Sequence, residues 1–237
     1  MVFGGLQKLT LLDYPDKTAC TLFTVGCNFI CPFCQNASLI VSDKDNLDDE
    51  CGKKRLYTSD VLEFLEKRQG LLDGVCISGG EPLIREELEE FIDEVKKLGF
   101  LVKLDTNGSD PEKLDRLIKA GKIDYIAMDI KNSQEKYAQT IGITDYDISS
   151  INESINLLLS HAPDYEFRTT VVREFHDEND LISITHWIAG AKRYFLQKFT
   201  RSPGVLNNGL HDYSETEMQR MLSKVIKSLP ITELRGV

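Results

Sequence analysis

Short apolar runs alternate with longer stretches of helical periodicity along most of this chain. The apolar runs, rich in β-branched and aromatic residues, predict six strands. These strands are expected at 21–25, 75–77, 100–104, 123–128, 167–172 and 194–199. Between them, apolar residues recur on one helical face, as Leu88, Ile92 and Val95 do. This alternation favours parallel strands connected by helical crossovers.

Six strand–helix repeats are two short of the eight in a complete barrel. The pattern therefore predicts an α/β fold, specifically a partial (β/α)6 TIM-type barrel with one side open. Two of its helices are expected to begin with capping boxes, Ser150 with Glu153 and Ser214 with Glu217. We expect a single domain over 1–237, composed of a turn-rich lead-in or hairpin at 1–19, the barrel at 20–200 and a C-terminal loop and helix at 201–237.

Composition narrows the classes of function. The chain has 237 residues, of which 41% are hydrophobic, and a net charge of -10. Such a charge argues against nucleic-acid partners, whose phosphates require a basic face, and against an anionic membrane surface. No apolar run reaches the ~20 residues of a membrane span, and the N-terminus lacks the pattern of a secretory signal. We therefore expect a soluble, cytoplasmic protein.

Three of the six cysteines, Cys27, Cys31 and Cys34, fall within eight residues directly after the first predicted strand. Thiolates are the soft ligands that iron–sulfur clusters and zinc select. A complete protein-ligated cluster takes four cysteines, so three leave one iron without a protein ligand. A substrate or cofactor can bind at that open position. The bunched spacing is typical of metal ligands rather than of a disulfide framework, and it suits a reducing compartment.

A zinc site is the alternative interpretation of this loop. Its fourth ligand would be Cys51, Cys20 or Cys76. Zinc loops usually come as two C-x2-C knuckles, and this chain has no second knuckle. Cys51 lies in the charged stretch 42–55, which predicts an exposed loop. The roles of all three remaining cysteines stay open at this point.

Polar residues follow the next two predicted strands. Parallel strands bring their C-terminal ends to one edge, where functional loops gather. The second strand leads into Gly79-Gly80-Glu81. Paired glycines let a backbone approach a ligand closely, and Glu81 supplies an acceptor for a cationic group. The third strand ends in Asp105 and Thr106 before an Asn-Gly dipeptide, which by itself predicts an ordinary turn.

The fourth and fifth strands add charged side chains to this edge. Alternation along a strand places Asp129 and Lys131 on the same side, where they form an ion pair or bind a ligand. Arg168 on the fifth strand either binds a carboxylate bidentately or pairs with a neighbouring acid. Nothing in the sequence positions His176, so its role stays open.

The spacing C-x3-C-x2-C, with the aromatic Phe33 just before the third cysteine, resembles the signature of the radical S-adenosylmethionine family. The Gly79–Glu81 segment, one strand later, is similar to that family's Gly-Gly-Glu motif, which binds the methionyl ammonium. The resemblance implies that Cys27, Cys31 and Cys34 hold a [4Fe–4S] cluster. It also implies that S-adenosylmethionine chelates the fourth iron through its amino and carboxylate groups.

From Thr10 to Val172 the chain resembles the anaerobic ribonucleoside-triphosphate reductase activating proteins, which are related to pyruvate formate-lyase activating enzymes. The resemblance implies that Asp129 and Lys131 contact the cofactor and that Asp105 and Thr106 help to hold a monovalent cation. Phe33, Gln35 and Arg168 complete the expected cofactor contacts. Gln35, where a histidine is usual, and the segment 172–175, where a proline-glycine turn is usual, depart from the group's pattern near the expected substrate entrance.

The function implied by this resemblance is the generation of a radical. An electron from flavodoxin or ferredoxin passes through the cluster and cleaves S-adenosylmethionine, and the resulting 5′-deoxyadenosyl radical removes hydrogen from a backbone glycine of anaerobic ribonucleotide reductase. The open side of a six-stranded barrel suits the entry of an extended peptide loop. Two alternatives remain: a radical enzyme acting on a small molecule, and an iron–sulfur or zinc binding module without catalysis.

Overall fold

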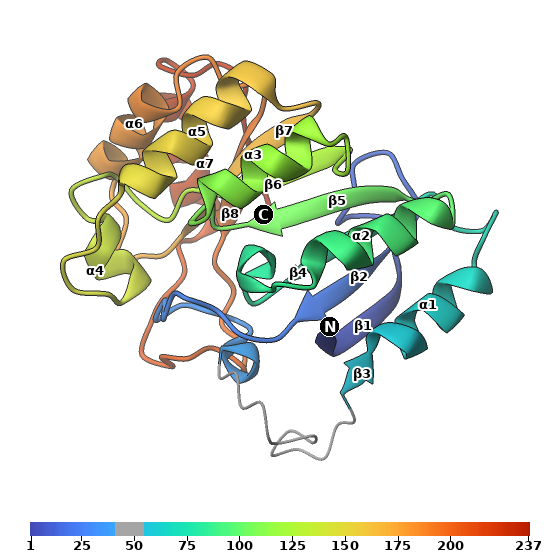
Figure 1. Ribbon diagram of the computed structural model, residues 1–237. Coiled ribbons are helices and arrows are strands. Elements are labelled where there is room, and N and C mark those ends of the chain that lie inside the picture. Colours follow the sequence, from blue (N-terminus) through green and yellow to red (C-terminus); the bar gives the residue numbers. More distant parts are fainter. Residues whose placement is uncertain (41–54) are drawn as a thin grey trace. The chain divides into compact units, whose positions relative to one another are not determined.

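The computed structural model describes residues 1–40 and 55–237. Cys51, and almost all of the loop predicted around it, lies outside the described residues. The chain divides into two compact units. Figure 1 labels their helices and strands. Unit 1 comprises 1–28, 38–106 and 112–126, and unit 2 comprises 29–37, 107–111 and 127–237.

Unit 1 contains a mixed sheet with the strand order β3-β1-β2-β4-β5. Its strands are β1 (Val2–Thr10), β2 (Ala19–Thr24), β3 (Leu56–Tyr57), β4 (Gly74–Gly79) and β5 (Leu101–Thr106). β1 pairs antiparallel with β2, so of the lead-in and the hairpin that the sequence offered for the start of the chain, the structure has the hairpin. β2, β4 and β5 pair in parallel, as the alternating pattern predicts.

The parallel register in unit 1 sorts side chains onto two faces. Thr21 of β2 is opposite Cys76 of β4, which is in turn opposite Lys103 of β5. Their successors Leu22, Ile77 and Leu104 point to the other face, because side chains alternate along a strand. All three of these successors are fully buried. One face of the sheet therefore belongs to an apolar core, and the other carries polar and ionisable groups.

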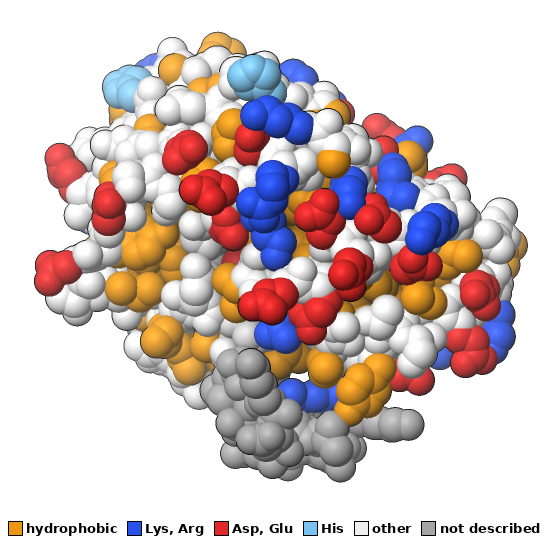
Figure 2. Space-filling view, viewed as in Figure 1, with side chains coloured by type: hydrophobic (Ala, Val, Ile, Leu, Met, Phe, Trp, Pro, Cys, Tyr) orange, Lys and Arg blue, Asp and Glu red, His pale blue; other side chains and the backbone are white. Residues whose placement is uncertain are grey.

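Helices α1 (Thr58–Glu66), α2 (Leu88–Lys97) and α3 (Pro111–Lys119) complete this part of the chain, with short 3-10 turns η1 (Ala37–Leu39) and η2 (Pro82–Ile84). α2 packs against β5 and α1. On the face shown in Figure 2, acidic and basic side chains lie among one another. Lys122 pairs with Glu89 and Asp93 of α2. None of the helices in the described ranges is both long and apolar enough to cross a membrane.

Unit 2 contains the parallel strands β7 (Tyr165–Val171), β8 (Tyr194–Lys198) and β9 (Thr232–Arg235), in that order. β6 (Tyr125–Asp129) begins in unit 1 and ends in unit 2. The helices are α4 (Tyr137–Ile141), α5 (Ser149–His161), α6 (Glu178–Trp187) and α7 (Glu215–Val225). α7 packs against α6 and β9.

All six predicted strands are present, and the expectation of an α/β fold rich in parallel strands is confirmed. β9 was not predicted because four residues, two of them charged, carry no apolar run. Its Arg235 nevertheless pairs with the buried Glu166 at 2.7 Å and lies 3.7 Å from the centre of the Phe195 ring. Packing across the sheet therefore stabilises a strand that its own sequence does not favour.

The two predicted capping boxes have different outcomes. Ser214 and Glu217 form one at the start of α7, as expected. The box expected at Ser150 and Glu153 is wrong, because α5 begins one residue earlier, at Ser149. There the Asp147 carboxylate accepts the Ser149 N–H at 2.9 Å. A carboxylate just before the helix thus satisfies one N–H of its first turn, and Ser150 caps none.

Candidate active site

The Gly-Gly pair at the end of β4 lies against the segment that leads into the cysteine loop. Gly79 has φ +108°, and a Cβ there would lie 2.4 Å from the Thr24 nitrogen. A Cβ on Gly80 would lie only 2.0 Å from the Gly26 carbonyl oxygen. The Glu81 N–H donates to that same oxygen at 2.8 Å. Only glycine fits at both positions, and their close approach sets the position of the backbone just before Cys27.

Glu81 is buried, with 2% of its surface exposed, and its carboxylate stabilises the loop. Oε1 accepts a hydrogen bond from the Thr106 hydroxyl at 2.7 Å and one from the Leu83 N–H at 3.0 Å. Hydrogen bonds of this kind offset the desolvation of a buried charge. Two residues predicted for the site, Glu81 and Thr106, are therefore in direct contact, although they follow different strands.

Asp105, also predicted for the site, belongs to a buried charge cluster on the polar face of β4 and β5. The Lys103 ammonium pairs with its Oδ1, and the Ser78 hydroxyl donates to its Oδ2 at 3.0 Å. The Lys103 side chain is 1% exposed, lies 3.9 Å from the Cys76 sulfur and faces the Tyr125 ring at 5.8 Å. Sequence reasoning missed Lys103, because a lysine inside an apolar run gives no sign of its partner.

In unit 2 one carboxylate holds two cationic side chains. The Lys131 ammonium lies 3.0 Å from Asp129 Oδ2, and the Arg168 Nε lies 2.9 Å from Asp129 Oδ1. The sequence offered each of these two contacts as one of two possibilities, an ion pair or the binding of a ligand. Burial acts to lower the pKa of Lys131, but the negative charges of Asp129 and Cys31 outweigh it and raise that pKa. Lys131 is therefore charged and near Cys31.

His176, whose role the sequence left open, contacts the main chain on either side of this group. Its buried ring accepts the Val172 N–H at Nδ1 (3.1 Å), and Nε2 lies 2.8 Å from the Lys131 carbonyl oxygen. The neutral tautomer with its proton on Nε2 satisfies both contacts. Burial lowers the pKa of His176, which keeps the ring in that neutral form. His176 thus positions the main chain of Lys131.

The later part of the cysteine loop belongs to unit 2 and is held by hydrogen bonds whose acceptors are main-chain carbonyls. The Leu206 N–H donates to the Cys34 carbonyl at 3.1 Å, and the Gln35 side chain donates to the Thr200 carbonyl at 2.9 Å. Phe33 is buried and packs on the rings of Phe175 and His176, at 5.9 Å and 6.5 Å between centroids. The segment from 200 to 206 therefore fixes the loop, and no pattern in its residues indicates this role.

Tyr137 is a second residue that sequence reasoning missed, because the five-residue helix α4 was not predicted. Its side chain is fully buried, and its hydroxyl has no hydrogen-bond partner in the described part of the chain. Burial raises the pKa of Tyr137, while the positive charge of Lys131 acts in the opposite direction. The ring stacks on Tyr146, with centroids 6.3 Å apart. The charges of Lys131 and Cys31 both act on the Tyr137 hydroxyl, so this side chain lies near them.

The donor set of the cysteine loop fits an iron–sulfur cluster. Cys31 is buried, Cys27 and Cys34 are half-buried, and no other cysteine shares their loop. Burial raises the pKa of the Cys20 thiol to about 12, which keeps it protonated. Within 1–40 and 55–237, no group of three or more His, Cys, Asp or Glu side chains is arranged to hold a single metal ion. A complete protein-ligated cluster takes four thiolates, so the three cysteines of this loop fit a cluster with one iron open.

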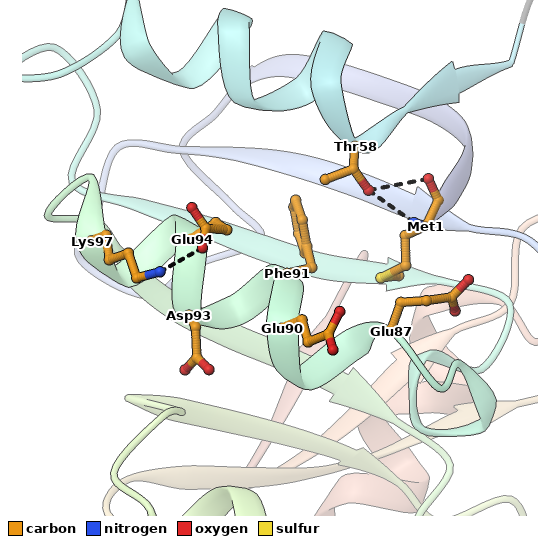
Figure 3. Close-up of a pocket in the computed structure, with 8 residues that line it drawn as sticks. All are labelled: Met1, Thr58, Glu87, Glu90, Phe91, Asp93, Glu94 and Lys97. Carbon is orange, nitrogen blue, oxygen red and sulfur yellow. Dashed lines mark hydrogen bonds and ion pairs between the residues drawn. The ribbon is translucent and has the colours of Figure 1, made fainter.

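A separate surface cavity of about 490 Å³ lies in unit 1, beside the start of the chain and α2 (Figure 3). The Met1 amino group donates to the Thr58 hydroxyl at 2.9 Å on one side, and acidic side chains of α2 line the other. It contains none of the residues predicted for the site. The lining residues are Met1, Thr58, Glu87, Glu90, Phe91, Asp93, Glu94 and Lys97.

Comparison with known proteins places these residues in a family. The model of the radical SAM superfamily matches residues 21–187. A protein of Methanocaldococcus jannaschii, provisionally named a glycyl-radical enzyme activating enzyme, is 32% identical over 200 residues, which is 83% of this chain and 79% of that protein. A second M. jannaschii protein with the same provisional name is 29% identical over 171 residues, covering 72% of this chain and 60% of its own length.

Solved structures share the fold at lower identity. A domain of pyruvate-formate lyase-activating enzyme from Bacteroides vulgatus has a TM-score of 0.57 and 18% identity, over 69% of this chain and 99% of that one. SuiB of Streptococcus suis, bound to its precursor peptide SuiA, has a TM-score of 0.70 and 13% identity, over 91% of this chain and 48% of that one. These likenesses are consistent with the predicted partial TIM-type barrel.

The chain belongs to the radical SAM superfamily. Enzymes of this superfamily use a [4Fe–4S] cluster together with S-adenosylmethionine, so both cofactors expected from the sequence are confirmed at the level of the family.

Proposed function

We propose that this chain is a glycyl-radical enzyme activating protein and that its partner is anaerobic ribonucleoside-triphosphate reductase. The named activity of its 32%-identical relative supports the class of reaction. The observation that carries the proposal is the loop with three cysteines, whose donor set leaves one iron of a [4Fe–4S] cluster open to a ligand. The partner itself rests on the resemblance of the sequence to the activating proteins of that reductase.

Cys27, Cys31 and Cys34 would ligate the cluster. The ammonium of Lys131 lies near Cys31, and a positive charge there favours the thiolate form that iron requires. Phe33, packed on Phe175 and His176, covers the loop with apolar surface. On one-electron reduction, the bound cluster and S-adenosylmethionine supply the radical chemistry that removes a hydrogen atom from a backbone glycine.

The chain's own residues would bind and orient S-adenosylmethionine. Asp129, Lys131 and Arg168 together carry one negative and two positive charges, and this net positive charge suits the carboxylate of the cofactor. The Asp129 carboxylate is also a hydrogen-bond acceptor for ribose hydroxyls.

The segment Gly79–Glu81 would receive the ammonium of S-adenosylmethionine. Its N–H groups at Gly80 and Glu81 already donate to Thr24 and Gly26, so its carbonyl oxygens are the groups suited to a cation. Gln35 would contact the cofactor only after its side chain leaves the Thr200 carbonyl.

The proposal also includes a cellular compartment and an electron donor. We place the protein in the cytoplasm, with flavodoxin or ferredoxin as the electron donor, because a reduced cluster requires a low-potential donor in a reducing compartment. A radical enzyme that acts on a small molecule is the competing function. It shares the cluster and the cofactor, so only the substrate distinguishes the two.

Anaerobic reconstitution with iron and sulfide tests the cofactor chemistry. The wild-type chain is expected to take up a [4Fe–4S] cluster and, with dithionite, to cleave S-adenosylmethionine. Cys31→Ala is expected to abolish the cluster spectrum and the cleavage. Cys20→Ala is the matched control, since Cys20 is buried and protonated, and it is expected to retain both. A wild-type chain that binds zinc and stays colourless would contradict the enzyme assignment.

Electron paramagnetic resonance tests the partner. The activated chain, mixed with anaerobic ribonucleotide reductase, is expected to produce a glycine-centred doublet on the reductase. A reductase whose radical glycine is replaced by alanine serves as the control. Cofactor cleavage without a doublet on the reductase would refute the partner and favour the small-molecule alternative.

A further inference from the structure

The charge cluster in unit 1 consists of Lys103, Asp105, Ser78 and Cys76. It affects whether Asp105 and Thr106 can hold the monovalent cation that the sequence resemblance implies. Lys103 is 1% exposed and its ammonium pairs with Asp105. A buried ammonium is stable only when the surrounding groups compensate its lost hydration. Here a carboxylate, a thiol sulfur at 3.9 Å and the face of the Tyr125 ring at 5.8 Å provide that compensation.

Both carboxylate oxygens of Asp105 already have a partner in this cluster. Asp105 Oδ1 pairs with Lys103, and Oδ2 accepts the Ser78 hydroxyl at 3.0 Å. The Thr106 hydroxyl donates to Glu81 at 2.7 Å. A Na⁺ or K⁺ ion bound by Asp105 would also lie beside the Lys103 ammonium, and like charges repel strongly in a buried site. Asp105 and Thr106 therefore do not fit a monovalent cation while Lys103 is charged.

We propose that the Lys103 ammonium takes the place of the monovalent cation, so that this chain carries its own fixed positive charge beside Asp105 and binds no Na⁺ or K⁺ there. A covalently attached ammonium needs no free ion and leaves the site charged at any salt composition. The Lys103 ammonium would orient S-adenosylmethionine through Asp105 and the neighbouring Thr106–Glu81 pair, and this part of the inference rests on the proposed function. The exclusion of Na⁺ and K⁺ from Asp105 does not depend on the proposed function.

The first test uses the chain without its cluster and measures the thermal unfolding midpoint in KCl and in tetramethylammonium chloride at equal ionic strength. The wild type is expected to have the same midpoint in both salts. Lys103→Ala removes the ammonium and leaves Asp105 with space for an ion. For this variant KCl is expected to raise the midpoint by about 3 °C or more over tetramethylammonium, which is too large to enter.

Two controls make the result specific. Lys96→Ala removes a lysine from a partly exposed ion pair with Asp124 in the same unit and is expected to show no difference between the salts. Lys103→Arg keeps the positive charge and is expected to behave as the wild type. A wild-type midpoint that rises saturably with K⁺, or a Lys103→Ala variant with no preference for K⁺, would overturn the proposal.

Equilibrium dialysis of the wild-type chain against radioactive Rb⁺, a substitute for K⁺, decides the question even if Lys103→Ala does not fold. No stoichiometric binding is expected, and one bound ion per chain that Asp105→Asn removes would refute the proposal. The reconstituted protein tests the effect on the cofactor, through the change that S-adenosylmethionine makes in the cluster's paramagnetic resonance spectrum. Its affinity is expected to change less than about twofold between the salts for the wild type, and about tenfold for Lys103→Ala.

These measurements separate the two proposals. Thermal unfolding and Rb⁺ dialysis involve neither cluster nor S-adenosylmethionine, so they report on Lys103 even if the proposed function is wrong. If the cluster forms and S-adenosylmethionine is cleaved, but the chain also binds Rb⁺, the result would support the proposed function and refute the role of Lys103.

Discussion

Replacing Gly80 by alanine is expected to disturb the cysteine loop without touching a cysteine. The new Cβ would lie 2.0 Å from the Gly26 carbonyl oxygen, whereas ordinary contact begins at 3.4 Å. The two backbone segments must therefore separate by about 1 Å or more, because Cβ atoms essentially never lie closer than 3.0 Å to another atom and neither side of the clash is a flexible side chain. Gly26 immediately precedes Cys27, so this displacement moves the first cluster ligand.

The magnitude follows from the nature of the clash. Overpacking a close contact costs about 1–3 kcal/mol, and here a backbone must also move. Urea unfolding of the cluster-free chain is expected to show a loss in that range. After anaerobic reconstitution, the iron and sulfide bound per chain are expected to fall well below the wild-type values, because a shift of this size misplaces the Cys27 thiolate.

Gly99→Ala is the matched control. Gly99 has φ +89°, and a Cβ added there would meet no atom within 4 Å, so alanine is strained by its backbone conformation alone. The expected loss is about 1–2 kcal/mol, similar to that of Gly80→Ala, but far from the cysteines in sequence. Its iron content is expected to match the wild type. Equal iron content in the two variants would refute the claim that Gly80 sets the position of Cys27.

Three further substitutions test other contacts. Thr106→Val removes a hydrogen bond to the buried Glu81 carboxylate and is expected to destabilise the chain by about 1.5–3 kcal/mol in urea unfolding, whereas Thr106→Ser retains it; equal losses would contradict that contact. Burial lowers the pKa of His176, so on acidification this residue is protonated in the unfolded chain before it is protonated in the folded chain. The free energy of unfolding is therefore expected to fall as the pH drops below about 6.5, by up to about 1.4 kcal/mol per pH unit. His176→Gln should remove this part of the slope, and an unchanged slope would assign it to other groups. Arg235→Ala removes the hydrogen bonds of 2.7 Å and 3.2 Å that Arg235 donates to the buried Glu166 carboxylate and is expected to cost about 1.5–3 kcal/mol, of which Glu166→Gln in the same chain restores part; no loss in the single variant would show that β9 contributes little.

The sequence by itself determined the features that depend on neighbouring residues. Three features can be recognised within short stretches of the sequence. They are the spacing of Cys27, Cys31 and Cys34 within one loop, the glycine pair after β4, and the alternation of apolar runs with helical faces. Each reflects a local physical constraint, such as the number of thiolates that a cluster binds or the backbone freedom of glycine. These features were sufficient to predict the parallel strands and the family.

Only the tertiary structure decided which polar groups meet. Glu81 bonds to Thr106 across 25 residues, Asp129 to Arg168 across 39 and His176 to Lys131 across 45. Lys103 gives the clearest case, because its sequence neighbours do not reveal that its ammonium is buried on Asp105. Pairing and burial depend on atoms that folding brings together from distant strands, and free energies of desolvation depend on that complete environment. The sequence therefore identifies the chemistry of this site, and the fold determines the charge and orientation of each group in it.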